Sequence, residues 1–236
     1  MRELLAYFAP RYGVTRLADI TWVHAVNTRA GLQSAGASSV MMLECDVRAA
    51  PTGEIILAHP PAIASDLSFA ALLDTLRTLD KGIKLDFKDP SIVPACLAAL
   101  RAARLAQPVL LNADIVQGQG GGPPAVEPGV FIDACTRLYP RGMLSLGWTT
   151  TAPPAGGYSA DNVGAMLALC AGRAGIVFPV RASLLPGSWA ALQALTRHPS
   201  AVLSLWDSRP VDQALRTWIT TRFPQGDYLY DCVTLP

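Results

Sequence analysis

The alternation of short apolar runs with helix-like stretches limits most strongly what this chain can fold into. Eight runs read as strands, at 20–24, 40–47, 82–88, 108–113, 143–148, 175–180, 201–206 and 228–232. Helix-like stretches separate them, near 28–37, 68–79, 91–105, 129–138, 160–172, 187–197 and 210–221. Such alternation favours parallel strands with helices packed outside them. Eight units predict one α/β domain over residues 1–236, a single (β/α)8 TIM barrel.

A doubly wound open sheet and a chain of two small domains are the alternatives to the barrel. A doubly wound open sheet usually begins with a glycine-rich first turn, and this chain has none there. Two small domains are compatible with 236 residues, although one large core also suits a chain that is 51% hydrophobic. A further short strand is expected within 54–58. Helices are expected to start after Asp66 or Ser68, after Ser159, and at Pro210.

Charged residues stand inside the second and third apolar runs, although only 16% of the chain is charged. Glu44 and Asp46 alternate with apolar residues in MMLECDV, as Lys84, Asp86 and Lys88 do in KGIKLDFK. Side chains two residues apart share one face of a strand, so each run directs its charges to one side. Charge inside an apolar run is costly unless it is paired or binds something.

Three of these residues carry carboxylates that can form a cage for a hard divalent cation. Glu44, Asp46 and Asp86 would hold Mg²⁺ first of all, with Ca²⁺ or Mn²⁺ as alternatives. Lys84 and Lys88 could then supply positive charge to a substrate phosphate. The alternative is a structural layer of salt bridges inside the barrel. The two interpretations are compatible, because a site without substrate also needs its charges offset.

His24 and His59 each end an apolar stretch, and both are candidates for acid and base catalysis at a phosphodiester. Each could instead be a hydrogen-bonded structural histidine. Asn112, Arg181 and Trp148 are weaker candidates for substrate binding. Arg181 could equally pair with a surface acid, and Trp148 could belong to the core. The third histidine, His198, is expected at the surface, at the end of a helix.

The composition of the whole chain limits which binding partners and which cellular compartment are expected. A net charge of +1 gives no general attraction to nucleic acid or anionic membranes, although a local basic pocket is allowed. Five scattered cysteines without a CxxC pair disfavour a zinc ribbon and favour a reducing compartment. No uncharged run approaches the roughly 18 residues that span a bilayer, so no stable membrane insertion is expected. The beginning of the chain lacks a signal-peptide pattern, which favours a cytoplasmic protein.

Seven segments occur in order over Ile20–Ala182: ITWVHAVN, MMLECDV, AHPP, KGIKLDFK, PVLLNADI, LSLGWTT and FPVRA. Together they resemble the menorin family. That family is similar to the phospholipase-C-like phosphodiesterase barrels, which include glycerophosphodiester phosphodiesterases and sphingomyelinase D toxins. The resemblance implies that His24 and His59 are catalytic and that Lys88 contacts phosphate. It also implies that the carboxylates of Glu44, Asp46 and Asp86 hold Mg²⁺.

The chain departs from the glycerophosphodiesterase pattern at two places. Ala25 and Val26 follow the first histidine, where that group usually has arginine and glycine. Pro60 follows the second histidine, where aspartate is usual. These differences disfavour a glycerophosphodiester substrate but leave the catalytic set in place.

The expected activity is that of a metal-dependent phosphodiesterase, either a hydrolase or a cyclising lyase. In the second case a hydroxyl beside the phosphodiester attacks and leaves a cyclic phosphate. An RNA end or a lysophospholipid would supply such a hydroxyl. The alternative from another class is an inactive barrel that serves as an adhesion or scaffold module. That alternative predicts an eroded site, whereas all the candidate residues are present.

Overall fold

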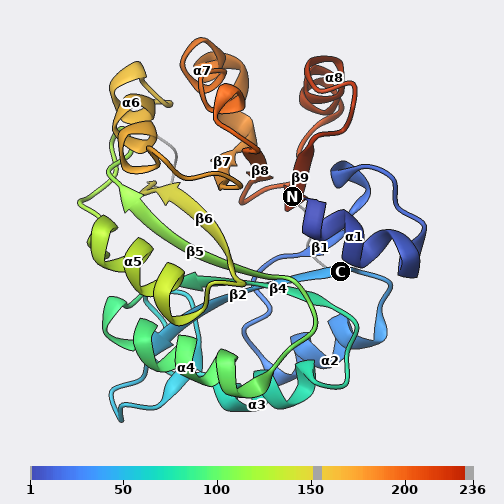
Figure 1. Ribbon diagram of the computed structural model, residues 1–236, viewed down its shortest axis with the longest axis vertical. Coiled ribbons are helices and arrows are strands. Elements are labelled where there is room, and N and C mark those ends of the chain that lie inside the picture. Colours follow the sequence, from blue (N-terminus) through green and yellow to red (C-terminus); the bar gives the residue numbers. More distant parts are fainter. Residues whose placement is uncertain (1, 151–155, 232–236) are drawn as a thin grey trace. The chain divides into compact units, whose positions relative to one another are not determined.

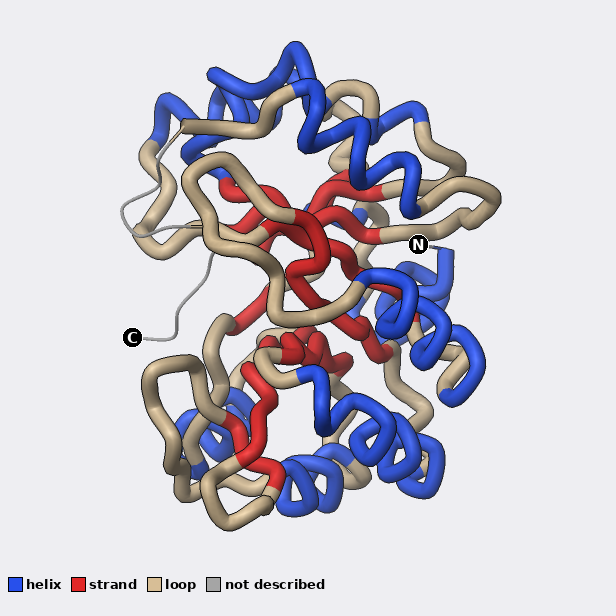
Figure 2. The backbone as a smooth tube through the Cα atoms, turned by 90° about the vertical axis from the view of Figure 1, so that its left-hand side faces the viewer, coloured by secondary structure: helices blue, strands red, loops and turns tan. Residues whose placement is uncertain are grey.

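The computed structural model describes residues 2–150 and 156–231. Strands and helices alternate along the chain, as the colour gradient of Figure 1 and the red strands and blue helices of Figure 2 show. The strands follow one another in the order β1-β2-β4-β5-β6-β7-β8-β9, and β3 pairs with β2. This succession confirms the α/β class and the (β/α)8 barrel. That residues 1–236 form one domain stays a prediction.

The described residues divide into two compact units. The early unit comprises Thr21–Ala113 and Ala125–Leu144. The late unit comprises 2–20, 114–124, 145–150 and 156–231. None of the described helices is long and apolar enough to cross a membrane.

The early unit contains the first parallel strands and the helices that follow them. Its strands are β1 (Trp22–Val23), β2 (Met42–Ala49), β3 (Ile55–Leu57), β4 (Gly82–Phe87) and the first part of β5 (Val109–Val116). Its helices are α2 (Arg29–Ala37), α3 (Phe69–Leu76), the short η2 (Pro90–Ile92), α4 (Val93–Ala103) and α5 (Pro128–Leu138). The pairs β1–β2, β2–β4 and β4–β5 are parallel, so their carboxyl ends lie along one edge. β3 returns antiparallel beside β2 and confirms the short strand expected within 54–58.

Lys81, just before β4, is a buried lysine whose contacts give it a purely structural role. Its side chain is buried, and its Nζ donates to the carbonyls of Ser38 (2.9 Å) and Val40 (2.6 Å). Burial lowers the pKa of this ammonium group. The two carbonyls follow helix α2 and would otherwise need other donors. Lys81 is thus a structural lysine, at the end of β4 opposite to Lys88.

The late unit contains the remaining strands and helices. Its strands are the last part of β5, β6 (Met143–Trp148) from Ser145 onward, β7 (Val177–Arg181), β8 (Val202–Trp206) and β9 (Tyr228–Asp231). Its helices are α1 (Arg2–Tyr12), η1 (Leu17–Asp19), α6 (Ala160–Leu169), η3 (Ala182–Leu184), α7 (Leu185–Leu192), η4 (Leu195–Arg197) and α8 (Gln213–Arg222). The pairs β6–β7, β7–β8 and β8–β9 are parallel.

The helix starts test the capping predictions. Ser68 and Ser159 are confirmed as the residues that cap α3 and α6, since each side chain accepts a backbone N–H of the first turn. The predicted start of the last helix at Pro210 is wrong. Helix α8 begins at Gln213, because the Asp212 side chain accepts the N–H of Leu215 at 2.8 Å.

Three further differences concern segment lengths and termini. Helix α1 was not expected, although Leu4 and Phe8 stand four residues apart and are both fully buried. Strand β5 continues to Val116, three residues beyond the predicted end. The segment 149–157, TTTAPPAGG, has the composition of a loop and lies partly outside the described residues, as does the predicted last strand at 228–232. Cys232 lies wholly outside them.

The segment 118–124, GQGGGPP, has a composition that predicts a flexible loop, but it packs closely within the late unit. A Cβ on Gly118 or Gly121 would overlap the backbone oxygen of Thr149. The Thr149 hydroxyl accepts the N–H of Gly118 at 3.2 Å and donates to the carbonyl of Gly122 at 2.6 Å. Close backbone approach therefore explains these glycines.

Candidate metal and acid–base site

Three carboxylates from β2 and β4 converge in the early unit. The parallel register places Asp46 directly beside Asp86 and Glu44 directly beside Lys84. Glu44, Asp46 and Asp86 each offer an oxygen atom, and these atoms lie within 4.8 Å of one another. The structure therefore brings together the three residues that the strand pattern singled out. An all-carboxylate donor set fits a hard divalent cation.

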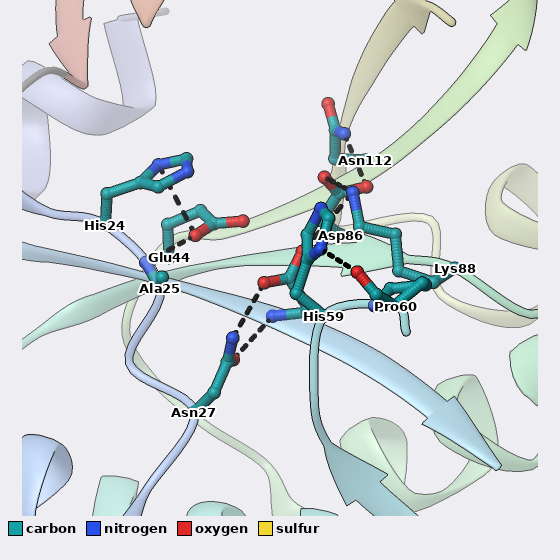
Figure 3. Close-up of polar contacts among 10 residues, drawn as sticks. His24, Ala25, Asn27, Glu44, His59, Pro60, Asp86, Lys88 and Asn112 are labelled. Carbon is teal, nitrogen blue, oxygen red and sulfur yellow. Dashed lines mark hydrogen bonds and ion pairs between the residues drawn. The ribbon is translucent and has the colours of Figure 1, made fainter. Parts of the chain in front are cut away.

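Glu44 is held from the segment that follows β1. Its Oε2 accepts the backbone N–H of Ala25 at 2.8 Å and lies 3.4 Å from His24 Nδ1, contacts that Figure 3 shows. Ala25 adopts a φ of +58°, a left-handed conformation that costs an L-residue about 1–2 kcal/mol. The Glu44 side chain is only 1% exposed, whereas His24 is 31% exposed. Glu44 is thus fixed from within the fold while the imidazole reaches solvent.

Asp46 is oriented by Asn27, which sequence reasoning had not assigned. The Asn27 side chain donates to Asp46 Oδ2 at 2.7 Å and accepts the Asp46 backbone N–H at 2.9 Å. Its own carbonyl accepts the Ser65 hydroxyl at 2.7 Å. The other carboxylate oxygen of Asp46 lies 3.3 Å from Lys88 Nζ. The available signal was the place of Asn27 at the end of ITWVHAVN, but the pairing with Asp46 appears only in three dimensions.

Asp86 has a charged partner on one oxygen and a neutral one on the other. Lys88 Nζ donates to Oδ2 at 2.6 Å, and the Asn112 amide donates to Oδ1 at 2.9 Å (Figure 3). Burial raises the pKa of Asp86, but the charges of Lys88 and Lys84 and these hydrogen bonds outweigh it, so the pKa is lowered. Asp86 is therefore ionised at neutral pH. Asn112 meets this carboxylate, and its expected contact with substrate stays a prediction.

His59 lies in the exposed loop between β3 and α3. Its Nδ1 is 2.6 Å from the carbonyl oxygen of Pro60. A carbonyl only accepts, so Nδ1 carries the hydrogen and Nε2 of the neutral ring keeps its lone pair. His24 has a parallel arrangement, because its Nδ1 faces a carboxylate. In both rings Nδ1 therefore meets an oxygen acceptor.

Arg181 and Trp148, the remaining predicted site residues, belong to the late unit. Arg181 Nε lies 3.4 Å from Asp207, and its Nη2 donates to Ser208. The Arg181 and Asp207 side chains are 6% and 8% exposed, so the acid that pairs with this arginine is buried and not on the surface. Trp148 is buried and donates to the carbonyl of Asn162 at 3.1 Å. Their predicted roles in substrate binding remain predictions.

His198 differs from its expected place at the surface. The residue is half-buried, and its ring meets that of Phe178 edge to face with centroids 5.9 Å apart. Its Nε2 lies 3.3 Å from the carbonyl of Cys170. The chain turns back after η4, and this turn brings the imidazole onto the late unit's core.

The fold is that of known barrel phosphodiesterases. A proposed glycerophosphodiester phosphodiesterase from Galdieria sulphuraria superposes with a TM-score of 0.60 at 11% identity, over 92% of this chain and 95% of that one. A glycerophosphodiester phosphodiesterase from Agrobacterium tumefaciens gives 0.51 at 14% identity, over 90% and 96%. An L-ribulose 3-epimerase also gives 0.51 at 12% identity, over 92% and 81%. These similarities establish the barrel fold, and the epimerase shows that the barrel does not determine the reaction.

The family follows from sequence. Residues 16–226 match the Menorin N-terminal domain. Human Protein FAM151B is 33% identical over 246 residues, which cover 97% of this chain and 88% of the human protein. The chain belongs to the menorin N-terminal domain family.

Proposed function

We propose that the chain is a metal-dependent phosphodiesterase. The observation that carries the proposal is the cluster of Glu44, Asp46 and Asp86, whose carboxylate oxygens lie within 4.8 Å of one another. Three carboxylates face two lysines, Lys84 and Lys88, which leaves an excess of one negative charge while His24 beside Glu44 is neutral. Burying such an excess is costly unless a cation offsets it.

In this proposal Glu44, Asp46 and Asp86 hold Mg²⁺, with Ca²⁺ or Mn²⁺ as alternatives. The bound ion supplies positive charge to phosphate oxygens as negative charge develops on them. Lys88, which reaches Asp46 and Asp86 and remains 18% exposed, is the residue we assign to the substrate phosphate. Lys84 is buried beside Glu44 and offsets charge within the cluster.

Each of the two imidazoles carries out one of the two proton transfers. His59 acts as the base, because its Nδ1 hydrogen is committed to the Pro60 carbonyl and Nε2 can accept a proton. His24 acts as the acid, because Glu44 beside its Nδ1 stabilises the imidazolium that gives up its Nε2 proton. His24 thus protonates the leaving alkoxide, while His59 takes the proton of the attacking hydroxyl.

The nucleophile is water or a hydroxyl adjacent to the phosphodiester. A neighbouring hydroxyl forms the new P–O bond within the substrate while the leaving-group bond breaks, and a cyclic phosphate remains. Such intramolecular attack can have an effective concentration of about 10⁵ M or more. An RNA end and a lysophospholipid both carry this hydroxyl, so both are proposed substrates, in a cytoplasmic setting.

The test uses purified protein, Mg²⁺, a short RNA, the matched DNA and, in parallel, a lysophospholipid. We expect cleavage of a substrate with a neighbouring hydroxyl, loss of cleavage on chelation, and loss in His59→Ala. A cyclic phosphate product establishes the intramolecular route, and cleavage of the lipid alone restricts the substrate to lipids. Absence of turnover on all three, together with absence of Mg²⁺ binding, contradicts the proposal and favours a scaffold role.

A further inference from the structure

The loop that carries His59 is closed at its base. Residues 58–68 connect β3 to α3, and the backbone N–H of Leu57 donates to the carbonyl of Leu67 at 3.0 Å. A loop of this length with adjoining ends is compact and surface-exposed. The position of His59 therefore depends on what holds the loop between these ends.

Three contacts fix the two ends of the loop to neighbouring elements. Ala58 N–H donates to the carbonyl of Asp46 at 2.9 Å. The Ser65 hydroxyl donates to the carbonyl of Asn27, and Asp66 accepts the N–H of Arg29 at 3.0 Å. Residues 59–64 between them are all exposed. A stretch exposed to this extent has few packing contacts to keep it in place.

Arg48 ties the middle of the loop to the sheet. It stands two residues after Asp46 on β2, on the strand face that Glu44 and Asp46 share. Its Nη1 donates to the carbonyl of Ala62 at 2.7 Å, and Ala62 N–H donates to the carbonyl of His59 at 3.1 Å. Arg48 therefore holds the far side of the turn that begins at His59.

We infer that Arg48 is a positioning residue, which acts through His59 by holding the turn 59–62 in place. The inference rests on the proposed function, in which His59 is the base. A hydrogen bond from a guanidinium is stronger than one between neutral groups, so its loss releases the turn. A displacement of about 1 Å at a reacting group can cost about 10² in rate.

The experiment compares Arg48→Ala, Arg48→Lys and Arg141→Ala with the unmodified protein. Arg141 also donates to a backbone carbonyl, that of Ala106 at 3.5 Å, and serves as the matched control. The probe is uridine 3′-(4-nitrophenyl phosphate) with Mg²⁺, which carries a hydroxyl beside its phosphodiester. We expect kcat to fall about 10- to 100-fold in Arg48→Ala with KM nearly unchanged, to recover partly in Arg48→Lys, and to stay unchanged in Arg141→Ala.

A double-mutant comparison separates positioning from general stability. In a His59→Ala background the Arg48→Ala change should have no further effect on the residual rate, whereas in a His24→Ala background it should keep its full effect. If Arg48→Ala lowers the cleavage rate by the same factor in both backgrounds, the inference is overturned. An unchanged kcat in the single variant Arg48→Ala also overturns it.

The ring resonances of His59, followed by NMR, give a readout that does not need turnover. They should shift in Arg48→Ala and not in Arg141→Ala. If the unmodified protein cleaves nothing, the proposed function fails while this comparison still decides whether Arg48 positions the imidazole. Unchanged resonances in Arg48→Ala overturn the inference.

Discussion

Buried charges gather at the carboxyl ends of strands in both units, but in different proportions. In the early unit, Glu44, Asp46 and Asp86 face Lys84 and Lys88. In the late unit, Arg181 at the end of β7 faces Asp207 just after β8. The first cluster has one more carboxylate than it has lysines. The Arg181–Asp207 pair has one charge of each sign, and the late unit also buries Asp231 at the end of β9.

This difference in charge balance distinguishes a cluster that a cation can stabilise from a pair whose two charges offset each other. A balanced pair with added hydrogen bonds satisfies itself, as Arg181 does with Asp207 and Ser208. An excess of ionised carboxylates repels itself until a cation arrives. We therefore expect a divalent ion to stabilise the early cluster and not the Arg181–Asp207 pair.

The largest expected effect comes from Asp86→Asn. The change removes one carboxylate from the early cluster and with it the excess negative charge, so Mg²⁺ binding should be lost and metal-dependent turnover should fall by about 10³ or more. Calorimetric titration with Mg²⁺ and the rate of phosphodiester cleavage measure the two effects. Asp207→Asn is the matched control and should bind Mg²⁺ normally. Full activity in Asp86→Asn would remove Asp86 from the proposed cage.

Next in size is the loss of the proposed acid in His24→Ala. With an alkoxide leaving group the rate should fall about 10²-fold, because the departing oxygen needs a proton. With a 4-nitrophenolate leaving group the rate should stay within a few-fold of the unmodified protein, whereas His59→Ala should be slow with both. Rates on the matched pair of substrates make the measurement. Equal losses with both leaving groups would show that His24 is not the acid.

The strand pattern predicted the fold and much of the early cluster for the same reason. Side chains alternate with period two, and parallel strands end at one edge, so a carboxylate pair on β2 meets Asp86 on β4 without further information. Helix α1 was not predicted because its apolar run, residues 4–9, is short and is followed by Pro10, a residue that usually ends a helix.

Residues that act through contacts distant in sequence could not be predicted. Asn27 pairs with Asp46 and Arg48 holds the carbonyl of Ala62, and neither contact leaves a periodic signal. The end of strand β7 was equally ambiguous, since an arginine there can face a substrate or an acid. The structure supplies Asp207 as its partner, because β7 and β8 are parallel neighbours and Arg181 lies beside Trp206, the residue before Asp207.

A smaller effect is expected from Asn27→Ala, which leaves the charges of the early cluster intact. Asp46 loses the amide that orients its carboxylate, so Mg²⁺ affinity should fall about 10- to 100-fold. Titration with Mg²⁺ measures the change. Ser65→Ala is the control, because it removes a donor to the Asn27 carbonyl and leaves the side-chain pair in place. Equal Mg²⁺ affinity in Asn27→Ala and the unmodified protein would show that Asn27 does not orient Asp46 for the metal and contributes only to the fold.

The smallest effect concerns the balanced pair and depends on pH. Burial raises the pKa of Asp207, but hydrogen bonds from Ser183 and the charge of Arg181 outweigh it, so the pKa is lowered. A lowered folded-state pKa means that the ionised carboxylate stabilises the fold above its unfolded pKa of about 3.9 and ceases to do so as pH falls through the folded value.

Asp207→Asn should therefore reduce the free energy of unfolding by about 1–2 kcal/mol at pH 7, where it leaves the Arg181 guanidinium buried without its counter-charge. The difference in Tm between variant and unmodified protein should shrink as the pH is lowered from 5 toward 3. Thermal melts across this range, with and without Mg²⁺, make the comparison. Because the late pair is balanced without a metal, the stabilisation by Mg²⁺ should be the same in both proteins. A Tm difference as large at pH 3 as at pH 7, or one that Mg²⁺ changes, would contradict the view that the Arg181–Asp207 pair is balanced without a metal.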